Sequence, residues 1–273
     1  MLSAWGRRVQ AGVLCLVLGG AGIVVAQMRG RIQSKYEPEM QDPVDDPPNA
    51  DYKGGFTIGR LRYRSPMDAR MRFGGYFRWG IDANKGDRLF ASILKRLTRI
   101  DVTPVEMIAD VDADDMFNTP FLFAVSVGDW QLSKPQADRL GEYLRRGGFL
   151  FVDDFHNDRE WEIFMSGIRQ MGFSDSVQEL EGSSQAFHTV FDLKERIRVS
   201  GQNVVHGSGI ERGGVVPHWR GIMDERGRMI VAISFNQDIG DGWEFADDPD
   251  YPERMSGEAM RLGTNYVVYA MTH

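Results

Sequence analysis

Residues 144–154 have the sequence LRRGGFLFVDD, and this stretch decides the fold. The two glycines are expected to end a helix that begins at Ser133, because serine is a good helix N-cap and glycine favours the helix C-terminus. The four apolar residues 149–152 are typical of a strand buried on both faces. A helix closed by glycines and followed by a fully buried strand indicates a parallel α/β sheet.

The same alternation continues on both sides of this stretch. The strands expected from apolar patterning are 56–63, 102–105, 121–125 and 149–152. The helices expected from apolar spacing and caps are 87–97, 133–146, 161–171 and 256–272. Residues 218–223 and 229–235 flank a glycine-containing turn and predict a hairpin. We therefore predict an α/β fold, with a mostly parallel sheet flanked by helices and an added C-terminal hairpin.

Composition excludes several classes of protein. The chain has 273 residues, 42% of them hydrophobic, so disorder is not its dominant state. A net charge of -7 provides no positive field for nucleic acid, and we expect no nucleic-acid partner. The single cysteine, Cys15, excludes a disulfide framework and a thiolate zinc site.

The N-terminal residues predict export. Arg7 and Arg8 precede the uncharged apolar run 11–25, and Ala26 occupies a position that suits signal peptidase. We expect residues 1–26 to be a signal peptide, with an uncleaved signal anchor as the alternative. The protein would then be periplasmic or secreted, or anchored in the inner membrane. Residues 27–54 form an acidic, proline-rich linker, and residues 55–273 form one α/β domain.

Polar residues follow two of the expected strands. Asp153, Asp154 and His156 come after residues 149–152, and Asn236 and Asp238 come after residues 229–235. Because ligands gather at the carboxyl ends of parallel strands, we expect the two groups to converge. One aspartate would cap the helix that starts near residue 159, and Asp154 would face the ligand.

This edge of the sheet is also where a metal would bind. No cofactor is evident from the sequence, but a divalent metal is one option, with Asp154, His156 and Asp238 as candidate ligands and His188 or His206 as additions. Gly240 and Gly242 indicate a tight loop for a cation or a sugar. The other candidate ligand-binding residues of this loop are Asp241 and Trp243. Trp243 would either stack on a sugar ring or cover an edge of the core.

Arginines and aromatic residues alternate near the start of the domain. The arginines are Arg60, Arg62, Arg64, Arg70, Arg72 and Arg78. They would bind an anionic glycan, a phosphate or a partner protein, or they would pair with acids of the same chain. Ser126 follows the strand 121–125, but no G-x-S-x-G motif surrounds it, which disfavours a serine hydrolase.

Several motifs together resemble the DUF4159 family, a bacterial family of undefined activity. The motifs are RLRY at 60–63, PFLF at 120–123, LRRGGFLFVDD at 144–154, HTVF at 188–191, and the stretch from Gly227 to NYVVYA at 265–270. The resemblance covers residues 55–273 and implies a flavodoxin-like sheet similar to class I glutamine amidotransferases. It also implies association with envelope systems that contain MoxR-type ATPases and von Willebrand A-like proteins.

Amidotransferases of that class place a nucleophilic cysteine on a sharp turn after a strand. The chain without residues 1–26 has no cysteine, so thiol amidotransferase chemistry is excluded. Whether the protein is an enzyme stays open, but the missing nucleophile favours a non-catalytic binding or scaffolding module of the envelope. Its partner would be an envelope protein or an anionic ligand, with a membrane contact only through an uncleaved anchor. The alternative is a metal-assisted hydrolase that acts on an envelope substrate.

Export can be tested directly. Because the run 11–25 is shorter than a membrane-spanning helix and ends at a cleavage signal, we expect the envelope protein to begin at Gln27. Mass spectrometry of the protein from its native envelope measures this terminus. A protein that retains Met1 and stays in the cytosol contradicts the expectation.

Overall fold

The computed structural model describes residues 39–41, 43–68 and 76–273. The expected signal peptide, the first part of the expected linker, Arg70 and Arg72 lie outside these residues. Among the residues described, no helix has both the length and the apolar character needed to cross a membrane.

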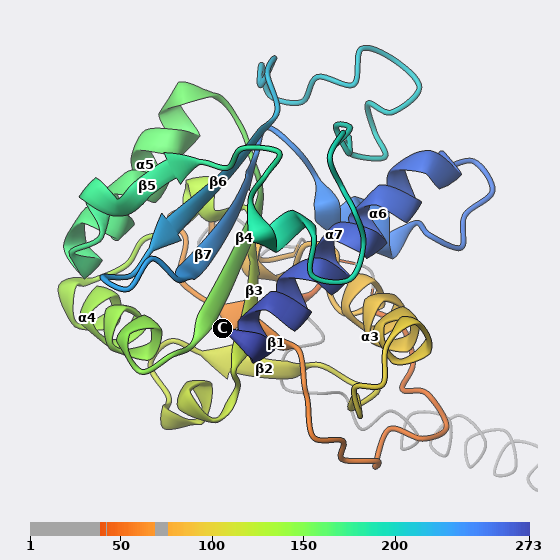
Figure 1. The fold of residues 1–273 in the computed structure, drawn as a ribbon, viewed down its shortest axis with the longest axis horizontal. Helices are drawn as coiled ribbons and strands as arrows, with labels where there is room; N and C mark the ends of the chain where they lie inside the picture. Colours follow the sequence, from red (N-terminus) through yellow and green to blue (C-terminus); the bar gives the residue numbers. More distant parts are fainter. Residues whose placement is uncertain (1–38, 42, 69–75) are drawn as a thin grey trace, which may run out of the picture. The chain divides into compact units, whose positions relative to one another are not determined.

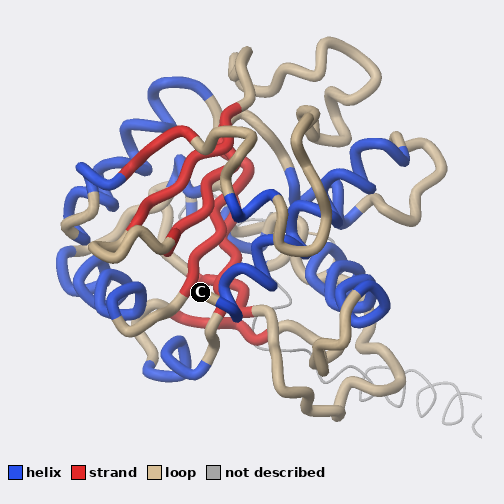
Figure 2. The backbone as a smooth tube through the Cα atoms, viewed as in Figure 1, coloured by secondary structure: helices blue, strands red, loops and turns tan. Residues whose placement is uncertain are grey.

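The core of the fold is a seven-stranded sheet in the order β2-β1-β3-β4-β7-β6-β5 (Figures 1 and 2). The strands are β1 (Gly59–Arg62), β2 (Met107–Asp110), β3 (Phe121–Val125), β4 (Phe149–Phe155), β5 (Val177–Glu179), β6 (His218–Met223) and β7 (Met229–Phe235). The neighbours from β2 to β7 pair in parallel, whereas β6 pairs antiparallel with both β7 and β5. The five parallel strands thus have the 2-1-3-4-5 order of flavodoxin-like folds, which confirms the predicted fold class.

Helices cover both faces of this sheet. The helices are α3 (Lys85–Leu97), α4 (Lys134–Arg145), α5 (Asn157–Met171), α6 (Ile239–Glu244) and α7 (Glu253–Thr272). Short 3-10 turns lie at Arg78–Gly80, Asp114–Asn118, Val127–Asp129, Ser174–Ser176 and Gln185–Phe187. Helices α3, α6 and α7 contact one another on one face, and α4 contacts α5 on the other (Figure 1).

Aromatic side chains fill the space between the sheet and α6. Phe123 of β3 and Phe151 of β4 are opposite each other in the register of the two strands, so their rings lie side by side, with centroids 5.2 Å apart. Trp243 of α6 lies 4.6 Å from the Phe123 ring and stacks on Phe90 of α3 at 4.0 Å. All four side chains are buried. This packing fixes α6 against the end of the sheet where the strands terminate.

The helix boundaries follow from the local sequence. Ser133 and Gln136 form a reciprocal capping box at the start of α4, and Pro135 lies in its first turn. Gly147, with φ of 104°, and Gly172, with φ of 86°, adopt the left-handed conformation after α4 and α5. Helix α5 begins at Asn157, four residues earlier than expected, because the Asn157 side chain accepts hydrogen bonds from the backbone N–H groups of residues 159 and 160.

Two expectations from the sequence are wrong in detail. No strand forms at 102–105, because Pro104 has no N–H to donate; Val102 makes a single bridge to Phe56, and the strand forms later as β2. The segment expected as a tight loop at 239–244 is the helix α6, capped by the Asp238 side chain. Glycine at position 242 lets α6 pack closely on α7, since a β-carbon on Gly242 would lie 2.5 Å from the Ala259 side chain.

Part of the expected linker packs on the domain. The side chain of Arg88 on α3 donates hydrogen bonds to the carbonyl groups of Val44 and Asp45. The backbone of Gln41 donates a hydrogen bond to the carbonyl of Gly80, and Met40 is buried. Residues from 39 onward therefore belong to the same compact unit as the sheet.

The buried strand predicts the effect of a charge in the core. Val152 is 0% exposed in the middle of the sheet, so Val152→Asp would bury a carboxylate with no partner and should lower the free energy of unfolding by roughly 3 kcal/mol or more. Urea denaturation followed by circular dichroism measures the change. Val215→Asp is the matched control, because Val215 is 61% exposed. Equal midpoints for the two variants would refute the buried position of β4.

Candidate functional site

Three neighbouring strands end in residues with an unusual backbone. Ser126 follows β3, Asp154 lies near the end of β4, and Asn236 follows β7, with φ of 50°, 51° and 59°. Such values are uncommon outside glycine and are held only where the surroundings enforce them. The pairing of β4 with β7 shifts register between Val152 and Phe155, so the chain is irregular where Asp154 lies. The carboxyl edge of the sheet is therefore where backbone strain is concentrated.

Asp154 is the centre of a buried polar network. Its Oδ2 accepts a 2.7 Å hydrogen bond from the Ser126 hydroxyl, and its Oδ1 accepts one of 2.7 Å from the Arg212 guanidinium. Burial by itself would raise the pKa of Asp154, but the charge of Arg212 and the bonds from His156 and Ser126 hold it below its usual value. Asp154 is therefore a stable carboxylate and a weak base.

Arg212 comes from the segment 201–217, which has no regular secondary structure. Besides Asp154, its guanidinium contacts Glu160 at 3.2 Å and Glu211 at 3.0 Å. Burial would lower the pKa of Arg212, but the three carboxylates raise it above its ordinary value. One arginine thus neutralises acids from β4, α5 and its own segment, and ties that segment to the sheet.

Two asparagines hold the same segment from the strand ends. The Asn157 side chain donates a 3.0 Å hydrogen bond to the carbonyl of Arg212, and the Asn236 side chain donates one of 2.7 Å to the carbonyl of Val216. The asparagines also contact each other, since the Asn157 backbone N–H donates to Asn236 Oδ1 at 3.0 Å. Asn236, a predicted site residue, therefore positions a loop.

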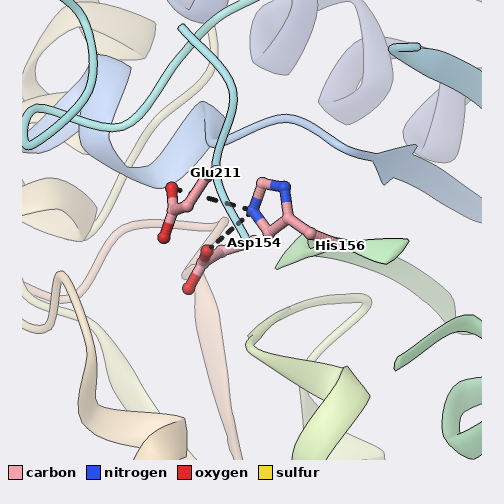
Figure 3. A group of neighbouring side chains, drawn as sticks. All are labelled: Asp154, His156 and Glu211. Carbon is pink, nitrogen blue, oxygen red and sulfur yellow. Dashed lines mark hydrogen bonds and ion pairs between the residues drawn. The ribbon is translucent and has the colours of Figure 1, made fainter. Parts of the chain in front are cut away.

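His156 faces two carboxylates. Its Nε2 lies 3.3 Å from Asp154 Oδ1 and 3.8 Å from Glu211 Oε2, and the ring is 2% exposed (Figure 3). Its Nδ1 has no hydrogen-bond partner. One donor atom from each of the three side chains lies within 4.8 Å of the others, a spacing that a metal ion could bridge. Glu211 supplies the third group, whereas His188 pairs with Asp192 and His206 is exposed.

A second group of carboxylates adjoins the first at Gly201. A β-carbon on Gly201 would lie 2.6 Å from Glu211 Oε2, 2.9 Å from Asp238 Oδ2 and 3.3 Å from Asp241 Oδ2, so these oxygens surround one point. Burial raises the pKa of Asp238, and it raises that of Asp241 to about 6. The two acidic groups predicted from the sequence therefore meet, through residues that the sequence did not single out.

Asp153 and Asp154 point to different partners. Asp153 Oδ2 accepts a 2.7 Å hydrogen bond from the backbone N–H of Gly240, in α6. The expectation that one of the two aspartates caps the helix after β4 is wrong, because Asn157 caps that helix and Asp153 binds α6 instead. Burial raises the pKa of Asp153 well above its usual value.

Three other predicted site residues belong to the interior or to ion pairs. Trp243 is 0% exposed and donates a hydrogen bond to the Ala259 carbonyl, so it is a core residue and is not available to a sugar. Arg60 is also 0% exposed and forms a bidentate pair with Asp87, and Arg62 pairs with Asp110. For Arg60 and Arg62 the structure thus favours pairing within the chain.

Ser126 does not form a catalytic pair. Its hydroxyl bonds to Asp154, whose lowered pKa makes it a poor proton acceptor, and the residue is 3% exposed. A serine nucleophile needs a neighbouring base and access for substrate. The geometry therefore agrees with the missing sequence motif in disfavouring a serine hydrolase.

Comparison with protein families identifies the relatives of this chain. Residues 57–271 match the family described as a domain of unknown function, DUF4159. The chain belongs to this family. None of the curated proteins compared with the sequence matches it. Membership of DUF4159 covers the whole sheet and the polar network but assigns neither a reaction nor a ligand.

Arg212 is the residue on which this DUF4159 network depends most. Arg212→Gln would leave the buried carboxylates of Asp154, Glu160 and Glu211 without their cation, and should lower the free energy of unfolding by roughly 3 kcal/mol. Urea denaturation at neutral pH measures the loss, and hydrogen exchange should increase over 201–217. The control is Arg226→Gln, at an exposed arginine in the β6–β7 turn. If the two variants are equally stable, Arg212 does not hold the segment.

Proposed function

We propose that this protein is an exported envelope protein that acts as a non-catalytic binding module. The observation that carries the proposal is that hydrogen bonds occupy both carboxylate oxygens of Asp154. Their partners are Ser126, His156 and Arg212. The bond from Arg212 holds the segment 201–217 on the sheet. The bonds to Asp154 leave Ser126 without a base, so the network supports a binding surface better than it supports a reaction.

The surface that the network supports is a groove of about 480 Å³. On one side are Val215 and Val216 of the segment that Arg212 holds, which are 61% and 55% exposed. On the other side are Trp161 and Arg220, with the guanidinium 4.3 Å from the centroid of the indole ring. Aromatic and arginine side chains beside exposed apolar residues are typical of protein-binding surfaces.

The basic side chains of the groove could bind an acidic group of a partner, although the groove also contains Asp158. Arg220 and His218 line it, and both are paired with Glu179, Arg220 at 3.0 Å and His218 at 3.1 Å. An acidic side chain of a partner could compete with Glu179 for these groups, while an apolar side chain would cover the valines. We therefore infer that the ligand is a segment of an envelope protein with adjacent acidic and apolar residues.

A metal-assisted hydrolase is the second candidate. It is favoured by the spacing of donor atoms from Asp154, His156 and Glu211 and by the unpartnered Nδ1 of His156. It is disfavoured by Arg212, which pairs with Asp154 Oδ1, the same oxygen that faces His156, and with Oε1 of Glu211. Purified protein supplied with Mg²⁺, Mn²⁺ or Zn²⁺ should hydrolyse neither ester nor phosphoester substrates. Turnover that Asp154→Asn abolishes would replace the binding proposal with the hydrolase.

Site-specific crosslinking tests the groove. A photoreactive amino acid at position 216 should crosslink one partner in the native envelope, because the side chain there faces the groove. The same amino acid at position 190, where Val190 is 42% exposed outside the groove, is the control. Trp161→Ala should reduce the crosslink at least about tenfold, as expected for an aromatic side chain that carries much of a binding energy. Equal crosslinking at both positions, or no effect of Trp161→Ala, would contradict the groove.

A further inference from the structure

Asp82 is a buried acid that the network around Asp154 does not use. It lies in the turn 81–84 between the 3-10 turn Arg78–Gly80 and α3, and it is 1% exposed. Neither of its carboxylate oxygens accepts a hydrogen bond from a donor group, and its side chain lies within hydrogen-bonding reach of the acid Asp241. Its φ is 60°, so the backbone too is held in an uncommon conformation. A buried carboxylate without partners is costly unless a proton or a cation neutralises it.

Two acids of α6 face Asp82. One oxygen from each of Asp82, Asp241 and Glu244 lies within 4.8 Å of the others. Asp82 Oδ2 occupies space left by Gly240, where an added β-carbon would lie only 2.1 Å from it. The absence of a side chain at Gly240 thus lets the carboxylate of Asp82 reach α6.

Asp153 gives an independent indication of a ligand. It is 0% exposed, and its Oδ1 has no partner, while its Oδ2 accepts from the N–H of Gly240. Asp82 and Asp153 therefore approach the same glycine from two different elements. Each also has at least one carboxylate oxygen without a hydrogen-bond partner.

The basic side chains that could neutralise this group are used elsewhere. Arg60 is the described cation whose charge acts on Asp82, and its guanidinium forms a bidentate pair with Asp87. Lys85, three residues after Asp82, pairs with Asp247 at 2.9 Å. In the part of the chain that is described, the positive charge near Asp82 is therefore already committed.

We propose that Asp82, Asp241 and Glu244 bind one divalent cation of the Ca²⁺ or Mg²⁺ class, with Asp153 beside them. All four residues offer carboxylate oxygens, the donors that these hard cations prefer and that Zn²⁺ prefers less than nitrogen or sulfur. The cation links the turn 81–84 to α6 and neutralises Asp82, whose buried carboxylate accepts no hydrogen bond. None of the proposed ligands lines the groove, although Asp241 also accepts a hydrogen bond from the backbone of Gln202 in the segment 201–217.

Metal titration tests this site. The full chain is freed of metal with EDTA and titrated with Ca²⁺ alone and with Mg²⁺ alone by calorimetry. One ion should bind per chain, and a hundredfold excess over Kd should raise Tm by roughly 5–10 °C. Asp82→Asn, which keeps the shape of the side chain, should weaken binding about 100-fold or more, because a charged ligand is lost. Asp192→Asn removes one exposed acid outside the site and should bind as the parent chain does.

Further variants keep the test decisive. If Asp82→Asn does not fold by circular dichroism, Glu244→Gln takes its place with the same expected loss. Absence of binding at about 5 mM Ca²⁺ and Mg²⁺, above the range of extracellular calcium modules, overturns the site. Binding that survives Asp82→Asn but disappears in His156→Gln also overturns it, because the ion then lies at Asp154. Crosslinking at position 216 in the Asp82→Asn chain measures the groove separately, because Asp82 does not line it.

Discussion

Parallel pairing of β3, β4 and β7 is the constraint on which the rest of this structure depends. Parallel strands end at the same edge, so the residues that follow them are brought together whatever their distance in sequence. Here those residues are Ser126, Asp154 and Asn236, each with a left-handed backbone. The edge therefore brings polar side chains together in the interior of the protein. The hydrogen bonds and ion pairs of the site stabilise these buried groups.

The protein neutralises its buried acids in two different ways. Around Asp154, one arginine from a distant segment contacts three carboxylates and fixes that segment in place. Around Asp82, the arginine whose charge reaches it among the described residues is Arg60, which is held by Asp87. Burial raises the pKa of Asp82 well above its usual value, because the charged form loses its solvation. Arg212 and its three carboxylates form a permanent ion-pair network. The acids around Asp82 favour a divalent cation that can bind and dissociate.

Aromatic packing connects the core to this edge. Trp243 stacks on Phe90 and contacts Phe123, so α6 is anchored by its one large aromatic ring. The same short helix presents Gly240, Asp241 and Glu244 to the turn 81–84. The position of the acids therefore depends on the burial of Trp243 in the same helix, and a change in the core would move the acids.

The sequence by itself determined the α/β class, most of the strands and helices, and the presence of acids after two strands, because apolar periodicity and capping residues are local signals. It did not reveal Asp82, Glu211 or Arg212, which lie in segments without periodicity and acquire their roles only when those segments pack on the sheet edge. It also left open whether Trp243 and Arg60 are exposed. Burial depends on which elements lie opposite in space, and only the tertiary structure decides that.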